Sequence, residues 1–271
     1  MKKIIITMCM VFVLIFSVGF IAVSAKNQKQ DKEFALPKNA VEVAPGVFYL
    51  GYALDKGKIV EGYAFLMKNS QDKKVRKPKP STESSCYTFL ASGAKWKTVE
   101  PYIVDTKNTI VLDEAFIRSN LVLDISKWES SVGIEILGEE NPAGEVNRDS
   151  IGSLNGANEV MFGDIDSPGA IGITIIWGIF GGRPSSRVLV EWDMVFDDVD
   201  FDWSATGEPG KMDFENIATH ELGHAVGLGD LYNSKCSSQT MYGYSDYGET
   251  NKRDLESGDI SGIQALYGSA P

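Results

Sequence analysis

Histidine is nearly absent from this sequence. The 271 residues include only two, His220 and His224, and both lie in the stretch THELGHAVGLGDLY at residues 219–232. Drift would scatter surface histidines along a chain, so this concentration indicates that both serve one site. If that site is a metal centre with three protein ligands, its third ligand must be of another type.

Cysteine is also scarce, with three residues in the chain. Cys9 lies inside an N-terminal apolar run and is removed if that run is cleaved off. Cys86 and Cys236 then remain, and in an exported protein two remaining cysteines favour one disulfide over two free thiols.

The N-terminus itself has the features of an export signal. Two lysines precede an uncharged apolar run over residues 4–23, and small residues follow at Ala22-Val-Ser-Ala25. This pattern predicts a signal peptide at residues 1–25 and a secreted, extracellular protein. An uncleaved run of the same length would instead anchor the protein to the outer face of a membrane.

Basic residues are outnumbered by acidic ones, 26 to 37, which gives a formal net charge of −11. Removal of residues 1–25 takes away two lysines and no acidic residue, so the charge becomes −13. Such a protein repels nucleic acid and anionic membrane surfaces, which excludes nucleic acid as a partner and leaves the membrane as one only if the N-terminal run stays uncleaved. Its carboxylates could hold hard cations. The apolar fraction of 43% is ordinary for a globular protein and excludes disorder and fibres.

Two segments precede the main domain. Residues 26–67 form an N-terminal segment that is a candidate pro-region, with strands expected at about 47–53 and 58–66 around a turn at Asp55-Lys56-Gly57. Residues 68–85 are rich in lysine and proline and form a basic linker. The linker is either a solvated tether or a processing site for a trypsin-like protease.

Residues 86–271 are typical of one α+β domain. A helix is expected at about 114–131, after the N-cap Asp113, because apolar residues recur there at spacings of three and four. A second helix should follow Asp213 and carry the histidines, and a third is expected at about 256–267. Strands are expected near residues 98–104, 134–138, 158–164, 171–178 and 187–196.

The two histidines are four residues apart, which places them one above the other on a single helix face. Their imidazoles can therefore share one metal ion, and zinc is the ion typical of the HExxH pattern. Glu221 is turned about 100° from His220. From there its carboxylate can take a proton from a zinc-bound water without binding the metal.

The residues after the helix supply a further candidate ligand and a turn. Gly227 tolerates the positive φ that ends a helix, so the chain can turn back and bring Asp230 to the metal. Met241 follows in the turn-rich segment TMYGY, which could pass beneath the metal.

These motifs resemble those of the metzincin metalloproteases, which share an extended HExxHxxGxx(H/D) motif and a Met-turn. Within that group the chain is similar to matrixins, particularly archaeal and bacterial ones, because three segments stand in the order expected of a matrixin. The resemblance covers about residues 86–268 and rests on WDMVFDDVDFDW (192–203), DFENIATHELGHAVGLGDLY (213–232) and LESGDISGIQALYG (255–268). It implies a zincin-like domain: a five-stranded twisted sheet, an active-site helix and a C-terminal helix, preceded here by a small β-hairpin segment.

The resemblance also implies an activity and assigns roles to single residues. It implies a zinc metalloendopeptidase with His220, His224 and Asp230 as ligands of one catalytic zinc ion. Glu221 would be general base and acid, and Met241 would form the Met-turn. The substrate would be a peptide or protein, and the enzyme would act as a monomer.

Substrate and calcium sites follow from the same resemblance. The strand at 171–178 would be an edge that pairs with an extended substrate through Ile173, Thr174 and Ile175, or else a plain core strand. Gly243 and Tyr244 would wall the pocket beyond the scissile bond. The segment with Asp197, Asp198 and Asp200 is similar to one that binds calcium in matrixins, and its alternative is a solvated acidic turn.

The sequence departs from the matrixin pattern at several points. It has no histidine left for a second, structural zinc, no tyrosine two residues after Met241, and no PRCG-type cysteine switch before the domain. Two other classes of protein stay open, a secreted zinc-bearing binding module without turnover and a membrane-anchored surface protein. A poised Glu221 argues against the binding module, since a structural zinc site uses a fourth protein ligand instead.

Overall fold

The N-terminal hairpin consists of β2 (Val47–Asp55) and β3 (Lys58–Asn69), close to the ranges expected. Its turn has two consecutive residues with positive φ, Lys56 at 47° and Gly57 at 81°. Such a two-residue turn matches the twist of antiparallel strands and fixes their register. A short strand, β1 (Val41–Ala44), pairs with the outer side of β2.

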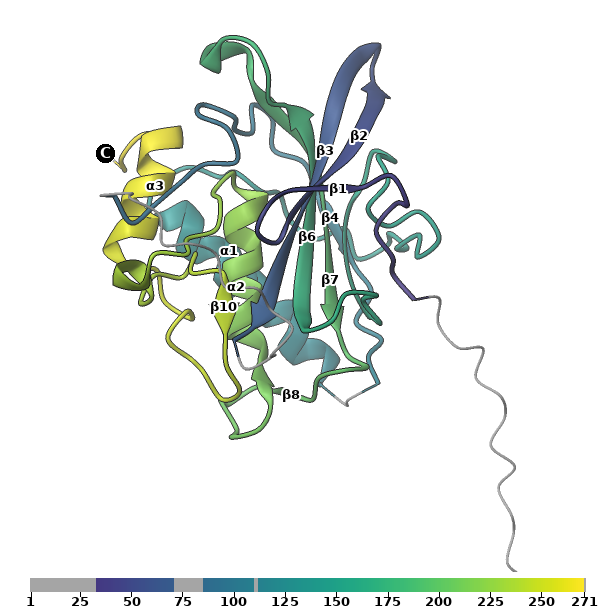
Figure 1. Ribbon diagram of the computed structural model, residues 1–271, viewed down its shortest axis with the longest axis vertical. Coiled ribbons are helices and arrows are strands. Elements are labelled where there is room, and N and C mark those ends of the chain that lie inside the picture. The colour runs from purple at the N-terminus through teal and green to yellow at the C-terminus, as the bar shows by residue number, and fades with distance from the viewer. Residues whose placement is uncertain (1–32, 71–84, 110–111, 271) are drawn as a thin grey trace, which may run out of the picture. The chain divides into compact units, whose positions relative to one another are not determined.

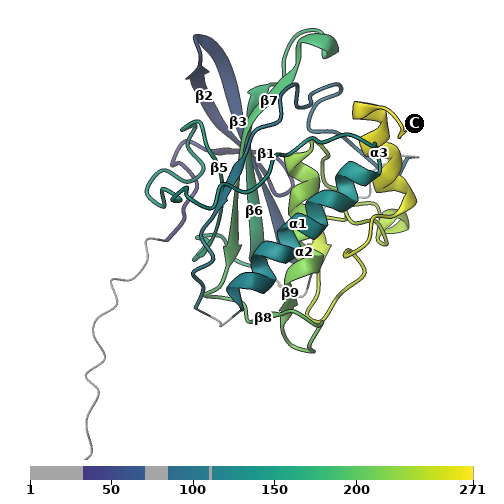
Figure 2. The same cartoon turned by 180° about the vertical axis from the view of Figure 1, so that it is seen from behind.

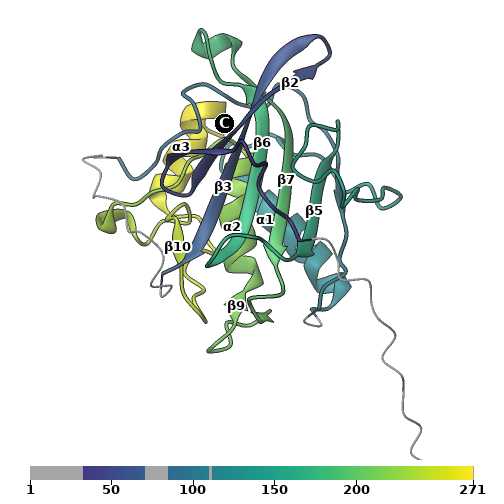
Figure 3. The same cartoon turned by 45° about the vertical axis from the view of Figure 1, so that its right-hand side comes forward.

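The hairpin is part of one mixed sheet in this computed structural model, which describes residues 33–70, 85–109 and 112–270. The strand order is β1-β2-β3-β6-β7-β5-β4, and β10 lies beside the end of β3 (Figure 1; Figure 3). The further strands of this sheet are β4 (Tyr102–Val104), β5 (Asn158–Gly163), β6 (Ala170–Ile179), β7 (Val188–Asp197) and β10 (Tyr244–Ser245). The short strands β8 (Trp203–Ser204) and β9 (Met212–Asp213) form a separate parallel pair.

The sheet is wider than the five strands expected, because the N-terminal hairpin joins it directly. β3 pairs antiparallel with β6 from Glu61↔Gly178 to Lys68↔Ala170, and β6 pairs on its other side with β7. The expectation that residues 171–178 form an edge strand is therefore wrong. Both sides of this strand are already hydrogen-bonded within the chain.

Residues 134–138, expected as a strand, do not form one. The backbone amides of Ile136 and Leu137 donate instead to Glu129 Oε1, at 2.7 and 3.0 Å. A helix side chain thus satisfies the donors that a strand would have used in a ladder.

Three helices lie on one face of the sheet, and α1 crosses in front of it in Figure 2. They are α1 (Glu114–Ser130), α2 (Phe214–Ala225) and α3 (Ser257–Tyr267), with 3-10 turns at Pro184–Ser186 and Ser234–Cys236. The apolar stripe of α1 is buried as its spacing predicts, at Ile117, Leu121, Ile125 and Trp128. Within the described part of the chain, no helix combines the length and apolar character needed to cross a membrane.

The core has one apolar cluster on each face of the sheet. Because successive side chains of a strand point to opposite faces, β3 contributes to both clusters. Phe65 and Met67 belong to the cluster under the helices, whereas Ala64 and Leu66 belong to the other. All four are at most 4% exposed, so β3 is packed into the sheet on both faces.

Candidate active site

Helix α2 carries both histidines in the centre of the molecule. Its N-cap, Asp213, accepts a hydrogen bond from the amide of Asn216, and ten consecutive residues from Asn216 to Ala225 are buried. The helix is followed by Gly227, whose φ of 109° turns the chain away from the helix axis. A Cβ at this position would approach the Ala94 carbonyl oxygen to 3.0 Å, so glycine is required for two reasons.

The backbone fixes the orientation of each imidazole. His220 Nδ1 lies 2.7 Å from the Thr240 carbonyl oxygen, and His224 Nδ1 lies 2.9 Å from that of Leu228. A carbonyl oxygen only accepts, so Nδ1 of each ring carries the proton and donates it. The lone pair of each Nε2 is then free to bind a metal, which is the usual arrangement of ligating histidines.

Asp230 completes the set of possible metal ligands. Its Oδ1 lies 3.3 Å from His220 Nε2 and 3.6 Å from His224 Nε2. Among the residues that the structure describes, these three are the one group of three or more histidine, cysteine or acidic side chains that converges closely enough to hold a metal ion. The three residues expected as zinc ligands therefore come together.

The three ligand atoms and one oxygen of Glu221 have no hydrogen-bond partner although all are buried. They are His220 Nε2, His224 Nε2, Asp230 Oδ1 and Glu221 Oε1. Unsatisfied buried polar atoms are costly, and four that converge at one point indicate a binding site. Two imidazoles and one carboxylate are a donor set that suits zinc with one coordination position left open.

Glu221 is held from the neighbouring strand. Thr174 on β6 donates its hydroxyl hydrogen to Glu221 Oε2 at 2.5 Å, while Oε1 points to the unpaired cluster. A Cβ at Gly172, two residues earlier on β6, would lie 2.8 Å from Oε1, so glycine leaves room for the carboxylate. Burial raises the pKa of Glu221, and the two nearby histidines oppose this shift.

Asp230 and His224 stabilise each other's charged forms. Burial alone would raise the pKa of Asp230, yet His224 and His220 beside it hold that pKa well below the usual carboxyl value. Burial lowers the pKa of His224, but the adjacent Asp230 outweighs burial and raises it. The pocket is thus built for an ionised carboxylate close to positive charge, which a metal cation would also supply.

Met241 lies against the active-site helix. A Cβ at Gly223, between the two histidines, would come within 2.1 Å of Met241 Sδ, so the close approach of this turn to α2 requires a glycine there. Asp259 of α3 fixes the turn, because its carboxylate accepts the amide hydrogens of Thr240 and Met241 at 2.8 and 3.1 Å.

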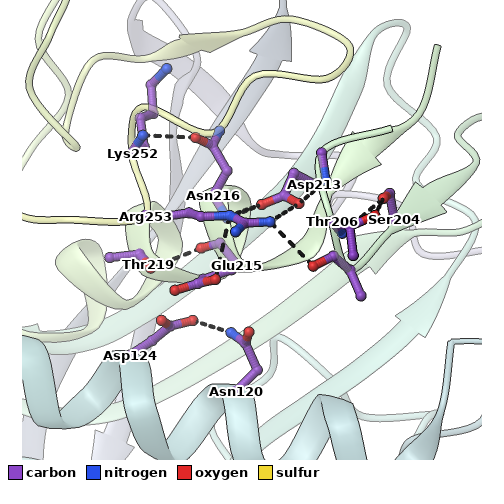
Figure 4. A network of polar contacts seen from close by, with 12 residues as sticks. Asn120, Asp124, Ser204, Thr206, Asp213, Glu215, Asn216, Thr219, Lys252 and Arg253 are labelled. Atoms are coloured by element: carbon purple, nitrogen blue, oxygen red, sulfur yellow. Dashed lines mark hydrogen bonds and ion pairs between the residues drawn. The ribbon is translucent and has the colours of Figure 1, made fainter. Parts of the chain in front are cut away.

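A charged network anchors the first turn of α2 (Figure 4). Arg253 makes a two-pronged contact with Asp213, from Nε to Oδ1 at 2.8 Å and from Nη2 to Oδ2 at 2.6 Å. Arg253 also lies 3.3 Å from Glu215, which accepts a hydrogen bond from Lys127 of α1 at 2.6 Å. The network connects α1, α2 and the segment before α3, and it holds the start of the histidine helix.

The residues expected to bind substrate lie near the site but not on an open edge. Thr174 contacts Glu221, whereas Ile173 and Ile175 point to the apolar cluster on the far face of the sheet. A Cβ at Gly243 would lie 2.9 Å from Asp230 Oδ1, so Gly243 permits the approach of that ligand. Tyr244 belongs to β10, which pairs parallel with the end of β3.

Two of the aspartates expected to bind calcium, Asp197 and Asp198, have carboxylates that accept hydrogen bonds from backbone amides. Asp197 Oδ1 accepts the amides of Val199 and Asp200, and its Oδ2 accepts that of Ile165. The Asp198 carboxylate accepts the backbone amide of Thr109, and the Asp198 backbone carbonyl accepts the Thr109 hydroxyl. Within the described ranges, Asp197, Asp198 and Asp200 are not brought together as a group of metal ligands.

Cys86 and Cys236 form a disulfide with a Cα–Cα distance of 5.4 Å. The bond connects the entry of the domain to the segment between Asp230 and Met241. It therefore restrains the chain close to the candidate ligand and the turn below it.

Three residues contribute to the site in ways that the sequence did not predict. The contact of Thr174 with Glu221 and the stacking of Phe65 on His224, with ring centroids 4.7 Å apart, depend on strand pairing that no local pattern reveals. The role of Asp259 had a local signal, since an acidic residue in the first turn of a predicted helix has free acceptors for nearby amides.

Comparisons with known proteins agree with this geometry. Residues 185–268 match the family model of Matrixin. The chain is 36% identical over 81 residues to Metalloendoproteinase 2-MMP of Arabidopsis thaliana, which is 27% of this chain and 20% of that protein. It is 42% identical to Matrilysin of Rattus norvegicus over 62 residues, 23% of this chain and 22% of that protein.

A longer match is to Metalloendoproteinase 5-MMP of Arabidopsis thaliana, 24% identical over 209 residues. It covers 77% of this chain and 44% of the relative. The chain thus spans less than half the length of these relatives.

Proposed function

Because this chain is a matrixin-like metzincin, we propose that it is a zinc metalloendopeptidase in which His220, His224 and Asp230 bind the metal and Glu221 is the general base. The observation that carries the proposal is the convergence of four buried atoms without hydrogen-bond partners, three on the ligands and one on Glu221. A site that only held a structural zinc would have no use for a free carboxylate oxygen at the open position.

The residues of the chain divide the chemical work between them. Zinc, when bound, supplies Lewis acidity, which makes water a stronger acid and polarises a carbonyl group. Glu221 Oε1 takes the proton of the attacking water and later passes it to the departing amine. Thr174 holds the other carboxylate oxygen, so Oε1 stays directed at the reacting atoms.

The substrate class follows from the sheet. An extended peptide can be recognised through its backbone when it pairs with a strand beside the catalytic residues, and β6 is the strand that contacts Glu221. The formal net charge of −11 argues against nucleic acid as a partner. We therefore propose peptides or proteins in extended conformation as substrates.

Export belongs to the same proposal. The apolar run over residues 4–23 lies outside the described residues, and its sequence supports a cleaved signal peptide. The Cys86–Cys236 disulfide is typical of a protein that works in an oxidising compartment. Residues 86–271 would be the peptidase domain, residues 26–67 an N-terminal segment and residues 68–85 a linker. Calcium binding stays a prediction of the sequence.

Casein hydrolysis by the purified protein tests the proposal. We expect hydrolysis that stops with 1,10-phenanthroline and returns when zinc is added in excess. The N-terminus of the secreted protein, determined by mass spectrometry, tests export in the same preparation. Hydrolysis that persists at full rate after complete removal of zinc would contradict the proposed mechanism.

A further inference from the structure

The metal site is closed in this structure. His220, Glu221 and His224 are 0% exposed, and the Asp230 side chain is 2% exposed. A peptide bond therefore cannot reach Glu221 unless a part of the protein moves. The segments packed against the site identify that part.

β3 covers the site from the side where a substrate would enter. The Phe65 ring stacks on His224 with centroids 4.7 Å apart and an interplanar angle of 26°. Phe65 is opposite Thr174 in the β3–β6 pairing, and Met67 is opposite Gly172. These two β6 residues are the ones that contact or make room for Glu221, so β3 runs directly past the catalytic carboxylate.

The backbone of β3 uses the hydrogen-bonding groups that a substrate would need. The Leu66 amide donates to the Gly46 carbonyl oxygen at 2.9 Å, on the side of the hairpin away from β6. Since peptide groups of a strand alternate in direction, those of Phe65 and Met67 face β6. An extended peptide could pair with β6 at this point only after β3 has left.

On the side of the site opposite β6, β3 and the loop before β2 also contact the segments that carry Asp230 and follow Met241. β10, the segment just after the Met241 turn, pairs parallel with Lys68 and Asn69 of β3. The Tyr232 hydroxyl lies 2.8 Å from the Pro45 carbonyl oxygen and 3.2 Å from Asp230 Oδ2. β3 thus lies between β6 and β10, beside the two histidines, as Figure 3 shows for the strands.

We propose that β3 is an autoinhibitory strand that fills the substrate cleft, so that this structure is a latent form and turnover requires β3 to leave β6 and β10. The proposal rests on the proposed function, because it identifies the cleft with the peptidase site. The sequence has no PRCG-type cysteine switch before the domain. In this proposal, the pairing of β3 and the Phe65 ring over His224 close the site instead. The buried side chains on both faces of β3 make spontaneous opening rare.

A reversible covalent clamp tests this proposal in the full chain. Ala64 and Ile175 face each other across β3 and β6 in a pair without mutual hydrogen bonds, where Cα atoms are about 4.5 Å apart and suit a disulfide. In Ala64→Cys/Ile175→Cys we expect oxidation to slow peptide hydrolysis at least 10-fold relative to the reduced form. Zinc loss to 1,10-phenanthroline should slow by a similar factor. The wild-type chain with and without reductant is the control, since reductant also reaches Cys86–Cys236.

A second variant removes the side chain that covers His224 instead of linking β3 to β6. Phe65→Ala removes the ring over His224, and we expect at least a 10-fold increase in both hydrolysis and zinc loss. Leu121→Ala, at an equally buried position on α1, controls for general destabilisation and should change neither rate as much. This variant decides the question if the cysteine pair does not fold.

The outcomes separate the two hypotheses. Equal zinc-loss rates in the oxidised and reduced clamp, or in Phe65→Ala and wild type, would show that β3 is a permanent strand that does not seal the site. If no variant hydrolyses peptides but the zinc-loss rates change as expected, the proposed function fails and the sealing role of β3 stands.

Discussion

Each histidine of the site has one ring nitrogen engaged by a backbone carbonyl and the other free. Under the proposed function, this division would let a chain with two histidines hold a metal: the backbone sets both tautomers, and Asp230 would supply the third donor. The carboxylate of Glu221 shows the same division, with one oxygen bound by Thr174 and one without a partner. Substitution of single residues that carry these free atoms should therefore separate zinc binding from catalysis.

Glu221→Gln should retain zinc and lose activity. The amide cannot accept a proton, whereas the three ligands are unchanged, so we expect kcat/KM to fall about 100- to 10,000-fold. Atomic absorption and peptide kinetics on the same sample check both parts. Glu114→Gln, at an exposed position of α1, is the matched control and should behave as wild type. Undiminished turnover in Glu221→Gln would remove this residue from the mechanism.

Asp230→Ala should lose zinc. Loss of a supporting contact around a metal costs about 10- to 100-fold in affinity, so loss of a ligand should weaken binding at least 100-fold. Asp230→His offers an imidazole at the same position and should bind zinc better than the alanine variant. The measurement is metal content after dialysis against a competing chelator. Full occupancy in Asp230→Ala would show that another residue completes the site.

The helices and strands place these residues through contacts that span the sequence. The N-cap of α2 is Asp213, whose side chain is fully buried and receives two hydrogen bonds from the Arg253 guanidinium. A buried carboxylate without its cationic partner is strongly destabilising. The start of the histidine helix therefore depends on a residue 40 positions later in the chain.

Arg253→Ala should lower the free energy of unfolding by about 3 kcal/mol, the lower end for a broken buried pair because Arg253 is partly exposed. Arg253→Lys keeps the charge but not the two-pronged geometry and should lose less. Lys211→Ala breaks an exposed pair with Glu208 and should cost less than about 1 kcal/mol. Urea unfolding of the three variants gives the comparison, and equal losses would contradict the role of burial.

At the scale of the whole molecule, stability should depend on acidic groups buried far from the metal site. Glu191, Asp193 and Glu159 lie in β5 and β7 and are at most 1% exposed. Amides of the loop before β5 donate to Glu191 and Asp193, from Asn155 and Gly152 respectively. Burial raises the pKa of Glu191 to about 7 and that of Asp193 well above its usual value.

The sign of the resulting pH dependence follows from these shifts. Glu191 has a higher pKa in the folded than in the unfolded protein, so the folded state binds more protons between pH 4.5 and about 7. The free energy of unfolding should therefore fall as the pH rises through this range. Glu191→Gln should make the fall smaller, measured by urea unfolding from pH 5 to pH 8. An unchanged slope would show that Glu191 titrates normally in the folded protein.

Local sequence patterns were sufficient for much of the site. A spacing of four residues on a helix places His220 and His224 on the same face. Gly227 turns the chain after the helix and brings Asp230 back toward the two histidines. Both relations involve only neighbouring turns of the chain, so the sequence pattern is enough to predict them. The helix ranges, the hairpin and its turn were predictable for the same reason. Each depends on side-chain periodicity or on backbone φ preferences within a few residues.

Only the tertiary structure decided which strands are neighbours. The apolar run at 171–178 is equally compatible with an edge or an inner position, because hydrophobicity reports burial and not the identity of the pairing partner. The placement of β3 on β6, of Thr174 on Glu221 and of Asp259 on the Met241 turn joins segments from 18 to more than 100 residues apart. The sequence by itself therefore determined which three side chains are the candidate metal ligands and which helix carries two of them. The packing of distant segments decided that the site is closed, since such pairing is selected by the complete fold.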